Sequence, residues 1–281
     1  MMLLRKAYQS FPKPLKLLLH PLVERYYQAG YRPLANQLSG FKLSGRDAKV
    51  YEANYEKNLV NLLEQIVHEG DICVDVGAYM GFITLLFVKF VGETGYVYAF
   101  DAHPANAKIV LHNIQQNNMT QRVKIENIAI ADSVTKLKIY AGRNNATAEW
   151  NIVGHDVDGN PTPTKAVLEI RATSLDAYFA DIPGVSIIKL DIEGAEALAL
   201  AGMSRLLNEQ RPVVVIEFHN DEGWQGRETL VQANYSLYDI NLKQWLADLL
   251  NHPRVYHCFA VPSEKIDVWK PILKHSETVQ K

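Results

Sequence analysis

The feature that most constrains how this chain can fold is a pair of short apolar runs, each of which leads into an acid. The first run, ICVDVGAYMG, covers residues 72–81 and includes a glycine turn, and the second, YVYAFD, covers residues 96–101. The residues between them, about 81–91, are predicted to form a helix. A strand, a glycine turn, a helix and a second strand form a βαβ unit, which in doubly wound sheets binds a ribose-bearing cofactor.

Alternating strand and helix patterns continue beyond this unit. They predict an α/β fold with a doubly wound, mostly parallel, seven-stranded sheet. The predicted strands cover about 72–76, 96–100, 123–130, 187–190, 213–218, 236–240 and 256–261. Helices are predicted at about 51–68, 81–91, 104–117, 195–207 and 224–234. Residues 132–173 interrupt the pattern with two strand-like runs, 136–140 and 167–172, so we expect a β-rich insertion there within one domain over 51–281.

The residues before this domain differ from it in charge. Residues 1–33 carry six Lys and Arg residues against one acid, Glu24, and prolines interrupt them at positions 12, 14 and 21. Leucine-rich segments between the prolines predict one or two short amphipathic helices, so residues 1–50 are expected to form an N-terminal helical extension and linker. A docked appendage is the first interpretation, and contact with a membrane surface or a partner through residues 1–33 is the alternative.

Composition places the chain among ordinary globular proteins, with 281 residues of which 48% are hydrophobic and 21% charged. The net charge of −2 gives no general affinity for nucleic acid, so we expect no nucleic-acid partner. The only cysteines, Cys73 and Cys258, lie in apolar runs that are predicted to be strands. Buried thiols of this kind are typical of a reducing compartment, so we expect a cytoplasmic protein.

The glycine spacing distinguishes two classes of cofactor. A dinucleotide site has the pattern G-x-G-x-x-G, whose closely spaced glycines let the backbone approach a pyrophosphate. Here Gly77 and Gly81 are separated by three other residues, while an acid that can bind a ribose, Asp101, is present. An adenosine cofactor without phosphates fits this pattern, and S-adenosylmethionine is the common one.

Candidate cofactor contacts follow the predicted strands, because ligands of such sheets bind outside the carboxyl ends of the strands. Asp75 would position the amino-acid part of the cofactor, and Asp101 would accept hydrogen bonds from the ribose hydroxyls. Ala129 is small and apolar enough to lie on the adenine, and Asp132 could reach its exocyclic amine. The complete predicted set is Asp75, Gly77, Ala78, Tyr79, Gly81, Asp101, Ala129 and Asp132.

Several motifs of the chain resemble those of the FkbM-type S-adenosylmethionine-dependent methyltransferases. They are VDVGAYMG (74–81), FDAHP (100–104), NIAIAD (127–132), TSLD (173–176), IKLDIEGAE (188–196) and VIEFH (215–219). The resemblance covers about residues 55–220 and implies a class I methyltransferase fold and, usually, O-methylation of sugars or natural-product hydroxyls. The sequence departs from the family at Tyr79, where the family often has Asn, and at Asp101, where it usually has Glu.

Two neighbouring strand ends carry the candidate catalytic residues, which are Asp191, Glu193, Glu217 and His219. Methyl transfer to a hydroxyl requires an acceptor in line with the sulfonium, exclusion of water and removal of the hydroxyl proton. Residues i and i+2 of a strand point to the same side, so each pair is expected to face the acceptor. His219 is the predicted base because its ordinary pKa lies near neutrality. A divalent cation held by these four side chains is a less favoured alternative, and no metal ligand is assigned.

The sequence therefore predicts an S-adenosylmethionine-dependent O-methyltransferase whose partner is a small-molecule or glycan acceptor, such as a saccharide or a glycosylated natural product. Two functions of other classes stay open. One is a nicotinamide-dependent oxidoreductase, against which the missing G-x-G-x-x-G pattern argues. The other is a non-catalytic adaptor that keeps the fold, against which the acids at the strand ends argue.

Overall fold

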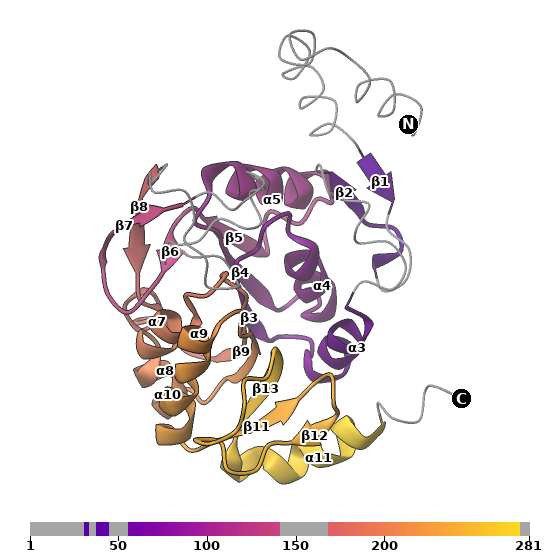
Figure 1. The fold of residues 1–281 in the computed structure, drawn as a ribbon. Coiled ribbons are helices and arrows are strands. Elements are labelled where there is room, and N and C mark those ends of the chain that lie inside the picture. The colour runs from indigo at the N-terminus through magenta and orange to yellow at the C-terminus, as the bar shows by residue number, and fades with distance from the viewer. Residues whose placement is uncertain (1–30, 34–37, 45–55, 141–167, 276–281) are drawn as a thin grey trace, which may run out of the picture.

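The computed structural model describes residues 31–33, 38–44, 56–140 and 168–275 and has one central sheet of eight strands (Figure 1). In spatial order these are β12 (Gln244–Trp245), β11 (Tyr235–Asp239), β13 (His257–Pro262), β10 (Val213–Glu217), β9 (Val185–Leu190), β3 (Ile72–Val76), β4 (Tyr96–Phe100) and β5 (Val123–Glu126). The prediction of seven strands is corrected to eight, because β12 adds a strand at the edge. A turn after β11 reverses the chain, and the two residues of β12 are too few to give an alternating pattern.

The strands from β5 to β10 are parallel, and β13 runs antiparallel between β10 and β11. From β3 the chain first adds β4 and β5 on one side, and later adds β9 and β10 on the other. The order of the strands thus reverses between β3 and β9, which we call the switch point. Ligands of open α/β sheets bind at the carboxyl ends of the strands beside such a point.

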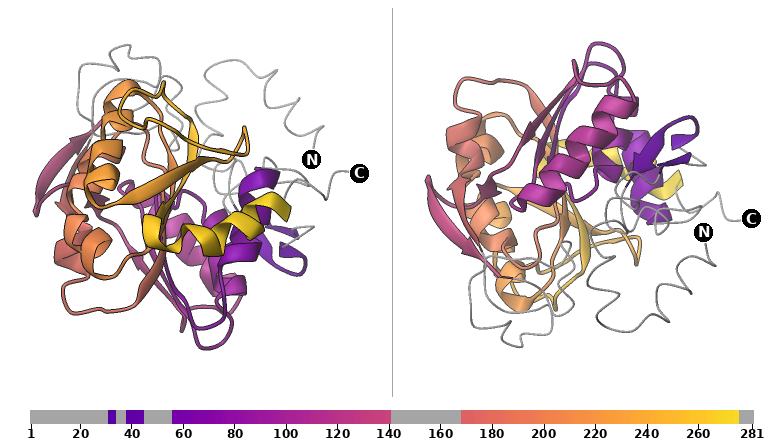
Figure 2. Two further views of the ribbon diagram at one scale, coloured as in Figure 1. Left: turned by 90° about the horizontal axis from the view of Figure 1, so that it is seen from below. Right: turned by 90° about the horizontal axis from the view of Figure 1, so that it is seen from above.

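Helices cover both faces of the sheet, as the two views along the vertical axis of Figure 1 show (Figure 2). One face packs against α3 (Lys57–Ile66), α4 (Phe82–Phe90), α5 (Pro104–Gln116) and α11 (Ile266–His275). The other packs against α6 (Leu175–Tyr178), α7 (Glu196–Ala201), α8 (Ser204–Glu209), α9 (Asp221–Gln225) and α10 (Arg227–Gln232). Burial of both faces explains why the central strands are almost continuously apolar. None of the described helices has both the length and the apolar character needed to cross a membrane.

Two helices that the sequence predicts as continuous are each interrupted at a glycine. Residues 195–207 divide into α7 and α8 at Gly202, where an added β-carbon would lie 2.1 Å from the carbonyl oxygen of Ala131. Residues 224–234 divide into α9 and α10 at Gly226, where a β-carbon would lie 2.7 Å from the Cα of Ala197. The backbone passes so close to its neighbours at both positions that only glycine fits without a shift.

A second sheet of three strands lies beside α7 and holds part of the predicted insertion (Figure 1). Its strands are β6 (Ala129–Ile130), β7 (Thr135–Ile139) and β8 (Leu168–Thr173), in the order β6-β8-β7. The antiparallel pair of β7 and β8 confirms the two predicted strands of the insertion, and residues 141–167 lie outside the described residues. The predicted strand 123–130 is corrected to two strands in different sheets, because the chain leaves the central sheet after Glu126.

The segment before α3 forms a small antiparallel pair, β1 (Tyr31–Pro33) with β2 (Lys42–Ser44). The sequence predicts a linker over 34–50, yet Leu38 and Leu43 are buried in the same hydrophobic core as residues of α3, α4 and α5. The one or two helices predicted for residues 1–33 fall on residues 1–30, which lie outside the described residues, and on 31–33, which form β1. The division into an extension over 1–50 and a domain over 51–281 stays a prediction.

Candidate active site

The turn after β3 has a backbone shape that only a glycine-rich sequence can adopt. Gly77 and Gly81 have φ angles of 84° and 83°, and Tyr79 between them has a φ of 51°. The backbone N–H groups of Gly77 and Ala78 donate to the carbonyl oxygen of Phe100, at 2.9 and 3.0 Å. A β-carbon at position 77 would lie 1.7 Å from the carbonyl oxygen of Asp191. The turn therefore brings β3 against the end of β9 at the switch point.

Asp101 directly follows β4, beside this turn, and is 7% exposed. Its Oδ2 accepts hydrogen bonds from the backbone N–H of Tyr79 at 2.8 Å and from Asn106 Nδ2 at 3.3 Å. Its Oδ1 accepts one from the backbone N–H of His103 at 2.8 Å, so this oxygen can accept one more. Burial raises the pKa of the Asp101 carboxyl to about 7, although these N–H donors oppose the shift.

Asp75 lies in β3, the strand before the glycine turn, and is completely buried. Thr84 Oγ1 donates a hydrogen bond of 2.5 Å to its Oδ2, whereas its Oδ1 has no partner among the described residues. Burial raises the pKa of this carboxyl, and the charge of Lys189 on the neighbouring strand opposes the rise. Lys189 in turn donates to Asp191 Oδ2 at 2.8 Å, so its charge acts on the carboxylate of β3 and on the one that follows β9.

The predicted catalytic residues come together around one imidazole, that of His219. Its Nε2 lies 3.3 Å from Glu217 Oε1, 3.5 Å from Asp191 Oδ1 and 3.8 Å from Glu193 Oε2. Its Nδ1 lies 3.0 Å from Oε1 of Glu196, a carboxylate that is completely buried at the start of α7. Four carboxylates thus surround a ring that is itself only 4% exposed.

A turn, and not a longer strand, brings Asp191 and Glu193 to this ring. Asp191 and Glu193 would share a side as residues i and i+2 only if the strand continued through them, and β9 instead ends at Leu190. Glu193 and Gly194 have positive φ angles of 55° and 99°, which fold the chain back after the strand. The two carboxylates still reach the same nitrogen of His219.

The electrostatics of the cluster differ from those of an isolated histidine. Burial alone would lower the pKa of His219, but its hydrogen bonds to Glu196 and Glu217 and the charges of Asp191 and Glu193 raise the pKa to about 11. Burial raises the pKa of the Glu193 carboxyl to about 7, although the charge of His219 opposes this shift. At neutral pH the imidazole is therefore a cation, and Glu193 is poised to gain or lose a proton.

Glu217 also contacts a second histidine, on the antiparallel strand β13. Its Oε2 lies 3.0 Å from His257 Nε2, and the two residues are paired in the register of β10 and β13. Burial opposes ionisation of Glu217, yet hydrogen bonds from His219 and His257 hold its pKa well below the usual range. One carboxylate therefore bridges two imidazoles.

Two of the predicted cofactor contacts lie in β6 of the second sheet or just after it. Ala129 is buried on β6 of the second sheet and does not end a strand of the central sheet, which corrects its predicted place. Asp132 is exposed and accepts a hydrogen bond of 2.9 Å from the Ser133 hydroxyl. Asn127, which belongs to the quoted motif NIAIAD but was given no role, donates to the carbonyl oxygen of Asp101 and so joins the end of β4 to the chain that enters β6.

Sequence reasoning missed three residues that shape the cluster, namely Lys189, Glu196 and His257. A lysine within the apolar run IIKL was a usable signal, because a buried lysine requires a charged partner. Glu196 belongs to the quoted motif IKLDIEGAE but was not given a role. No local pattern marks His257, which reaches Glu217 only through antiparallel pairing of strands far apart in the sequence.

Comparison with known families decides the identity of this arrangement. A family model described as Methyltransferase FkbM domain matches residues 75–249, more than half of the 281-residue chain. The chain belongs to the FkbM methyltransferase family. This FkbM methyltransferase is S-adenosylmethionine-dependent, and its α/β fold has the doubly wound, mostly parallel sheet described above.

Similar solved structures include methyltransferase FkbM from Methylobacillus flagellatus KT, at 16% identity and a TM-score of 0.45; the match covers 69% of this chain and only 43% of that one. A precorrin-6y C5,15-methyltransferase from Geobacter metallireducens GS-15 matches at 12% identity and a TM-score of 0.46, over 82% of this chain and 98% of that one. A SAM-dependent O-methyltransferase from Thermotoga maritima matches at 14% identity and a TM-score of 0.42, over 73% and 64%. Similarities this distant carry no argument about activity. No curated protein matches the chain.

The residues of this FkbM methyltransferase fit S-adenosylmethionine. The partnerless Oδ1 of Asp75 is an acceptor of the right charge for an ammonium group. Asp101 keeps one acceptor position for a ribose hydroxyl, and the positive φ angles of the glycine turn keep side chains out of the space beside it. The family often has Asn at the position of Tyr79, but this difference leaves the hydrogen bond to Asp101 intact, because its donor is the backbone N–H of residue 79.

Proposed function

We propose that this FkbM methyltransferase transfers the methyl group to a hydroxyl of a saccharide or a glycosylated natural product, and that it acts on no nucleic acid. The observation that carries the proposal is the set of carboxylates around His219 beside the switch point. Removal of a hydroxyl proton during O-methylation requires a base within hydrogen-bond reach, and several carboxylates are available there. The proposed setting is the cytoplasm, which suits two free and buried cysteines.

S-adenosylmethionine supplies an electrophilic methyl group when it is bound. Asp75 and Asp101 hold its amino-acid and ribose parts, and the turn from Gly77 to Gly81 allows the backbone to approach it. Ala129 and Asp132 stay proposed contacts of the adenine. These residues orient the cofactor, while the carboxylates at the ends of β9 and β10 face the acceptor.

Among the four predicted catalytic residues, we propose Glu193 as the group that takes the hydroxyl proton. Its pKa of about 7 matches a base that works near neutral pH. His219, the base predicted from the sequence, has its pKa raised to about 11 and therefore carries a proton before the reaction starts. As a buried cation it holds Asp191, Glu193 and Glu217 together despite their mutual repulsion.

Glu196 positions this cation and does not touch the acceptor. It is completely buried, and its Oε1 accepts from the backbone N–H of Gly194 at 3.0 Å while it contacts His219 Nδ1. The bond to Gly194 ties the turn that carries Glu193 to the same carboxylate. Replacement Glu196→Gln should therefore shift the pH profile of turnover, because it lowers the pKa of His219 without removing the base.

The experiment that tests the proposal is a methyl-transfer assay with S-adenosylmethionine and a panel of glycans and glycosylated small molecules. Glu193→Gln should reduce kcat by about 10²–10⁴ and leave cofactor affinity unchanged. Glu209→Gln, an exposed acid on α8, is the matched control and should behave as the parent. Full activity in Glu193→Gln would assign the base elsewhere, and binding of NAD in place of S-adenosylmethionine would favour the oxidoreductase. Cofactor binding without any transfer would favour the adaptor.

A divalent cation is the second candidate for activating the hydroxyl. Ligand atoms of Asp191, Glu217 and His219 lie within 4.8 Å of one another, which is a compatible spacing. Loss of activity on chelation, with recovery on addition of a divalent cation, would favour this version over Glu193.

A further inference from the structure

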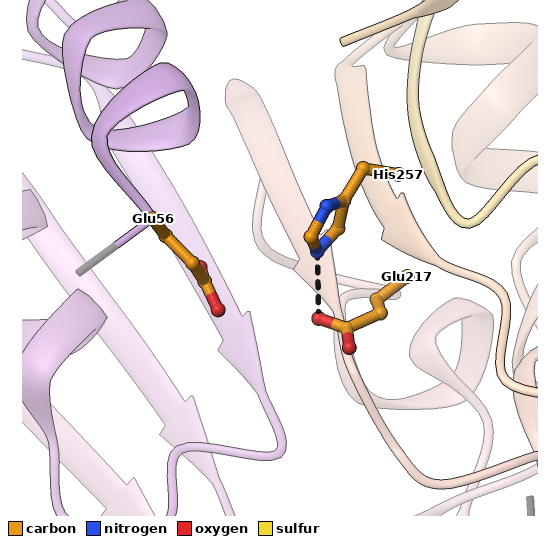
Figure 3. Close-up of side chains that lie close together, drawn as sticks. All are labelled: Glu56, Glu217 and His257. Atoms are coloured by element: carbon orange, nitrogen blue, oxygen red, sulfur yellow. Dashed lines mark hydrogen bonds and ion pairs between the residues drawn. The ribbon is translucent and has the colours of Figure 1, made fainter. Parts of the chain in front are cut away.

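A second group of potential ligands lies on the side of Glu217 that faces away from His219. It consists of Glu56, directly before α3, Glu217 at the end of β10 and His257 at the start of β13. Figure 3 shows the three side chains converging from these separate elements, with the bond between Glu217 and His257 drawn. One ligand atom from each residue lies within 4.8 Å of the others.

We propose that Glu56, Glu217 and His257 form a binding site for a first-row divalent transition-metal ion. This site shares Glu217 with the cluster around His219 but uses its other oxygen, Oε2, and it does not depend on the methyl-transfer reaction.

The spacing of the three side chains suits an ion of that size. An ion with metal–ligand distances near 2.1 Å places adjacent ligands about 3.0 Å apart and opposite ligands about 4.2 Å apart. Glu217 Oε2 and His257 Nε2 are already 3.0 Å apart, as adjacent ligands would be. The ligand atom of Glu56, directly before α3, lies within 4.8 Å of both, so a small movement of this side chain would complete the set.

The kinds of donor atom restrict which ion fits. One imidazole nitrogen with two carboxylate oxygens suits manganese, iron, cobalt or zinc, whereas calcium takes six to eight oxygen ligands. Three protein ligands leave coordination positions for water or another small ligand. The side chains of Glu217 and His257 are 12% and 15% exposed, so an ion can reach them from solvent.

The surroundings also support a bound cation. Metal-binding imidazoles generally donate their second N–H to an acceptor that fixes the ring. Asn241 Nδ2 lies 3.4 Å from His257 Nδ1, and a 180° rotation of this amide would turn its Oδ1, an acceptor, toward that nitrogen. Acidic side chains gather around Glu217, because Asp191, Glu193 and Glu196 all lie within 4 Å of the imidazole that Glu217 contacts. Asp75 and Glu196 each keep a buried carboxylate oxygen without a hydrogen-bond partner among the described residues. A divalent ion at Glu217 would offset part of this negative charge.

The ion would join three parts of the chain that are distant in sequence. Glu56 begins the helix that follows the N-terminal segment, and His257 begins the strand that closes the sheet. Glu217 belongs to this site and to the His219 cluster, so occupancy would fix the orientation of a carboxylate beside the acceptor.

Titration of the metal-free full-length protein with Mn²⁺, followed by electron paramagnetic resonance of the free ion, tests the proposal directly. The parent should bind one ion, and Glu56→Gln and His257→Gln should each weaken Mn²⁺ binding roughly 100-fold or more. Glu64→Gln, at an exposed acid on α3, the helix that Glu56 precedes, is the matched control and should bind as the parent does. Circular dichroism without metal checks that each variant is folded.

A variant in the other group of potential ligands, Asp191, Glu217 and His219, shows which of the two groups binds the ion. Asp191→Asn removes a ligand of the Asp191, Glu217 and His219 group and should leave Mn²⁺ affinity within about threefold of the parent under the proposal. Lost binding in Asp191→Asn together with unchanged binding in Glu56→Gln and His257→Gln would overturn it, as would an absence of Mn²⁺ binding by the folded parent. Neither result bears on methyl transfer, which is measured separately.

Discussion

At the scale of single residues, Gly77 offers a test of how the switch point is built. A β-carbon there would overlap the carbonyl oxygen of Asp191, at 1.7 Å, in a backbone with a φ of 84°. We expect Gly77→Ala to lower the free energy of unfolding by about 2–5 kcal/mol and to abolish binding of S-adenosylmethionine. Thermal unfolding and calorimetric titration measure the two effects.

Gly40 is the matched control, because its φ is 90° and an added β-carbon would meet nothing within 4 Å. Gly40→Ala should lower the free energy of unfolding by only about 1–2 kcal/mol, which is the cost of the left-handed conformation. It should leave cofactor affinity unchanged. Equal losses in both variants would show that the contact with Asp191 contributes nothing beyond the backbone conformation.

The raised pKa of Asp101 predicts that stability and cofactor affinity both change with pH. Burial raises its folded pKa to about 7, above the ordinary value near 4. Between these values the folded protein holds a proton that the unfolded chain releases, so this residue makes the ligand-free protein less stable as pH rises from about 4 to about 7. If the ionised form accepts from the ribose, cofactor affinity rises about tenfold per pH unit up to about 7 and then levels off. Calorimetric titrations from pH 5.5 to 8.5 should show this step in the parent and a flat, weaker affinity in Asp101→Asn.

How far the site could be predicted from the sequence depends on how local each contact is. Asp191, Glu193, Glu217 and His219 were predicted together because they follow apolar runs, and parallel strands end at the same edge. Glu56 could not be predicted, because nothing near it in the sequence indicates that it approaches β10 and β13. The protonated state of His219 was also missed, since it arises from four carboxylates that only the folded chain brings together.

At the scale of elements, β2 is held to α5 by a carboxamide. Asn113 is completely buried; its Oδ1 accepts from the backbone N–H of Ser44 at 2.7 Å, and its Nδ2 donates to Ser44 O at 2.9 Å and to Met80 O at 2.8 Å. Asn113→Ala leaves these backbone groups without a partner and should lower the free energy of unfolding by about 1–3 kcal/mol. Because Met80 belongs to the glycine motif, the affinity for S-adenosylmethionine should fall too.

Asn208→Ala is the control for this element. Asn208 lies on the surface of α8 and bonds only within its own helix, at 2.8 Å to Ser204 O, so its loss should cost no more than about 0.5 kcal/mol. Urea unfolding of both variants provides the comparison. An Asn113→Ala protein as stable as Asn208→Ala would mean that β2 does not depend on this carboxamide.

The elements that the sequence predicted best are those with long, regular apolar patterns. Strands 72–76 and 96–100 are found with the predicted bounds. The errors lie where tertiary packing decides: Gly202 and Gly226 interrupt predicted helices because neighbouring backbone passes close to them. Helix α11 was not predicted, although its buried Leu273 and half-buried Trp269 pack into the hydrophobic core on the face of the sheet that α3, α4 and α5 cover.

At the scale of the whole molecule, the switch point brings cofactor and acceptor residues together through direct contacts between strands. Asp191 donates its N–H to Val76 O at 3.1 Å, and Lys189 lies opposite Asp75 in the register of β9 and β3. The carboxylate that would hold the cofactor and those that would face the acceptor are therefore linked through one buried lysine. A change on either side of the switch point should affect both binding steps.

The N-terminal segment tests where the folding unit begins. A truncation that starts near residue 34 removes the basic residues 1–33 but keeps Leu38, Leu43 and Ser44, which are buried against the core. It should keep its affinity for S-adenosylmethionine, whereas methyl transfer or binding to anionic vesicles should fall if residues 1–33 contact the acceptor or a membrane. A truncation that starts at residue 45 also removes the two leucines, each worth about 1.5–3 kcal/mol of buried surface, and should lose stability and cofactor binding together. Loss of cofactor binding in the truncation that starts near residue 34 would instead show that residues 1–33 are part of the folded core.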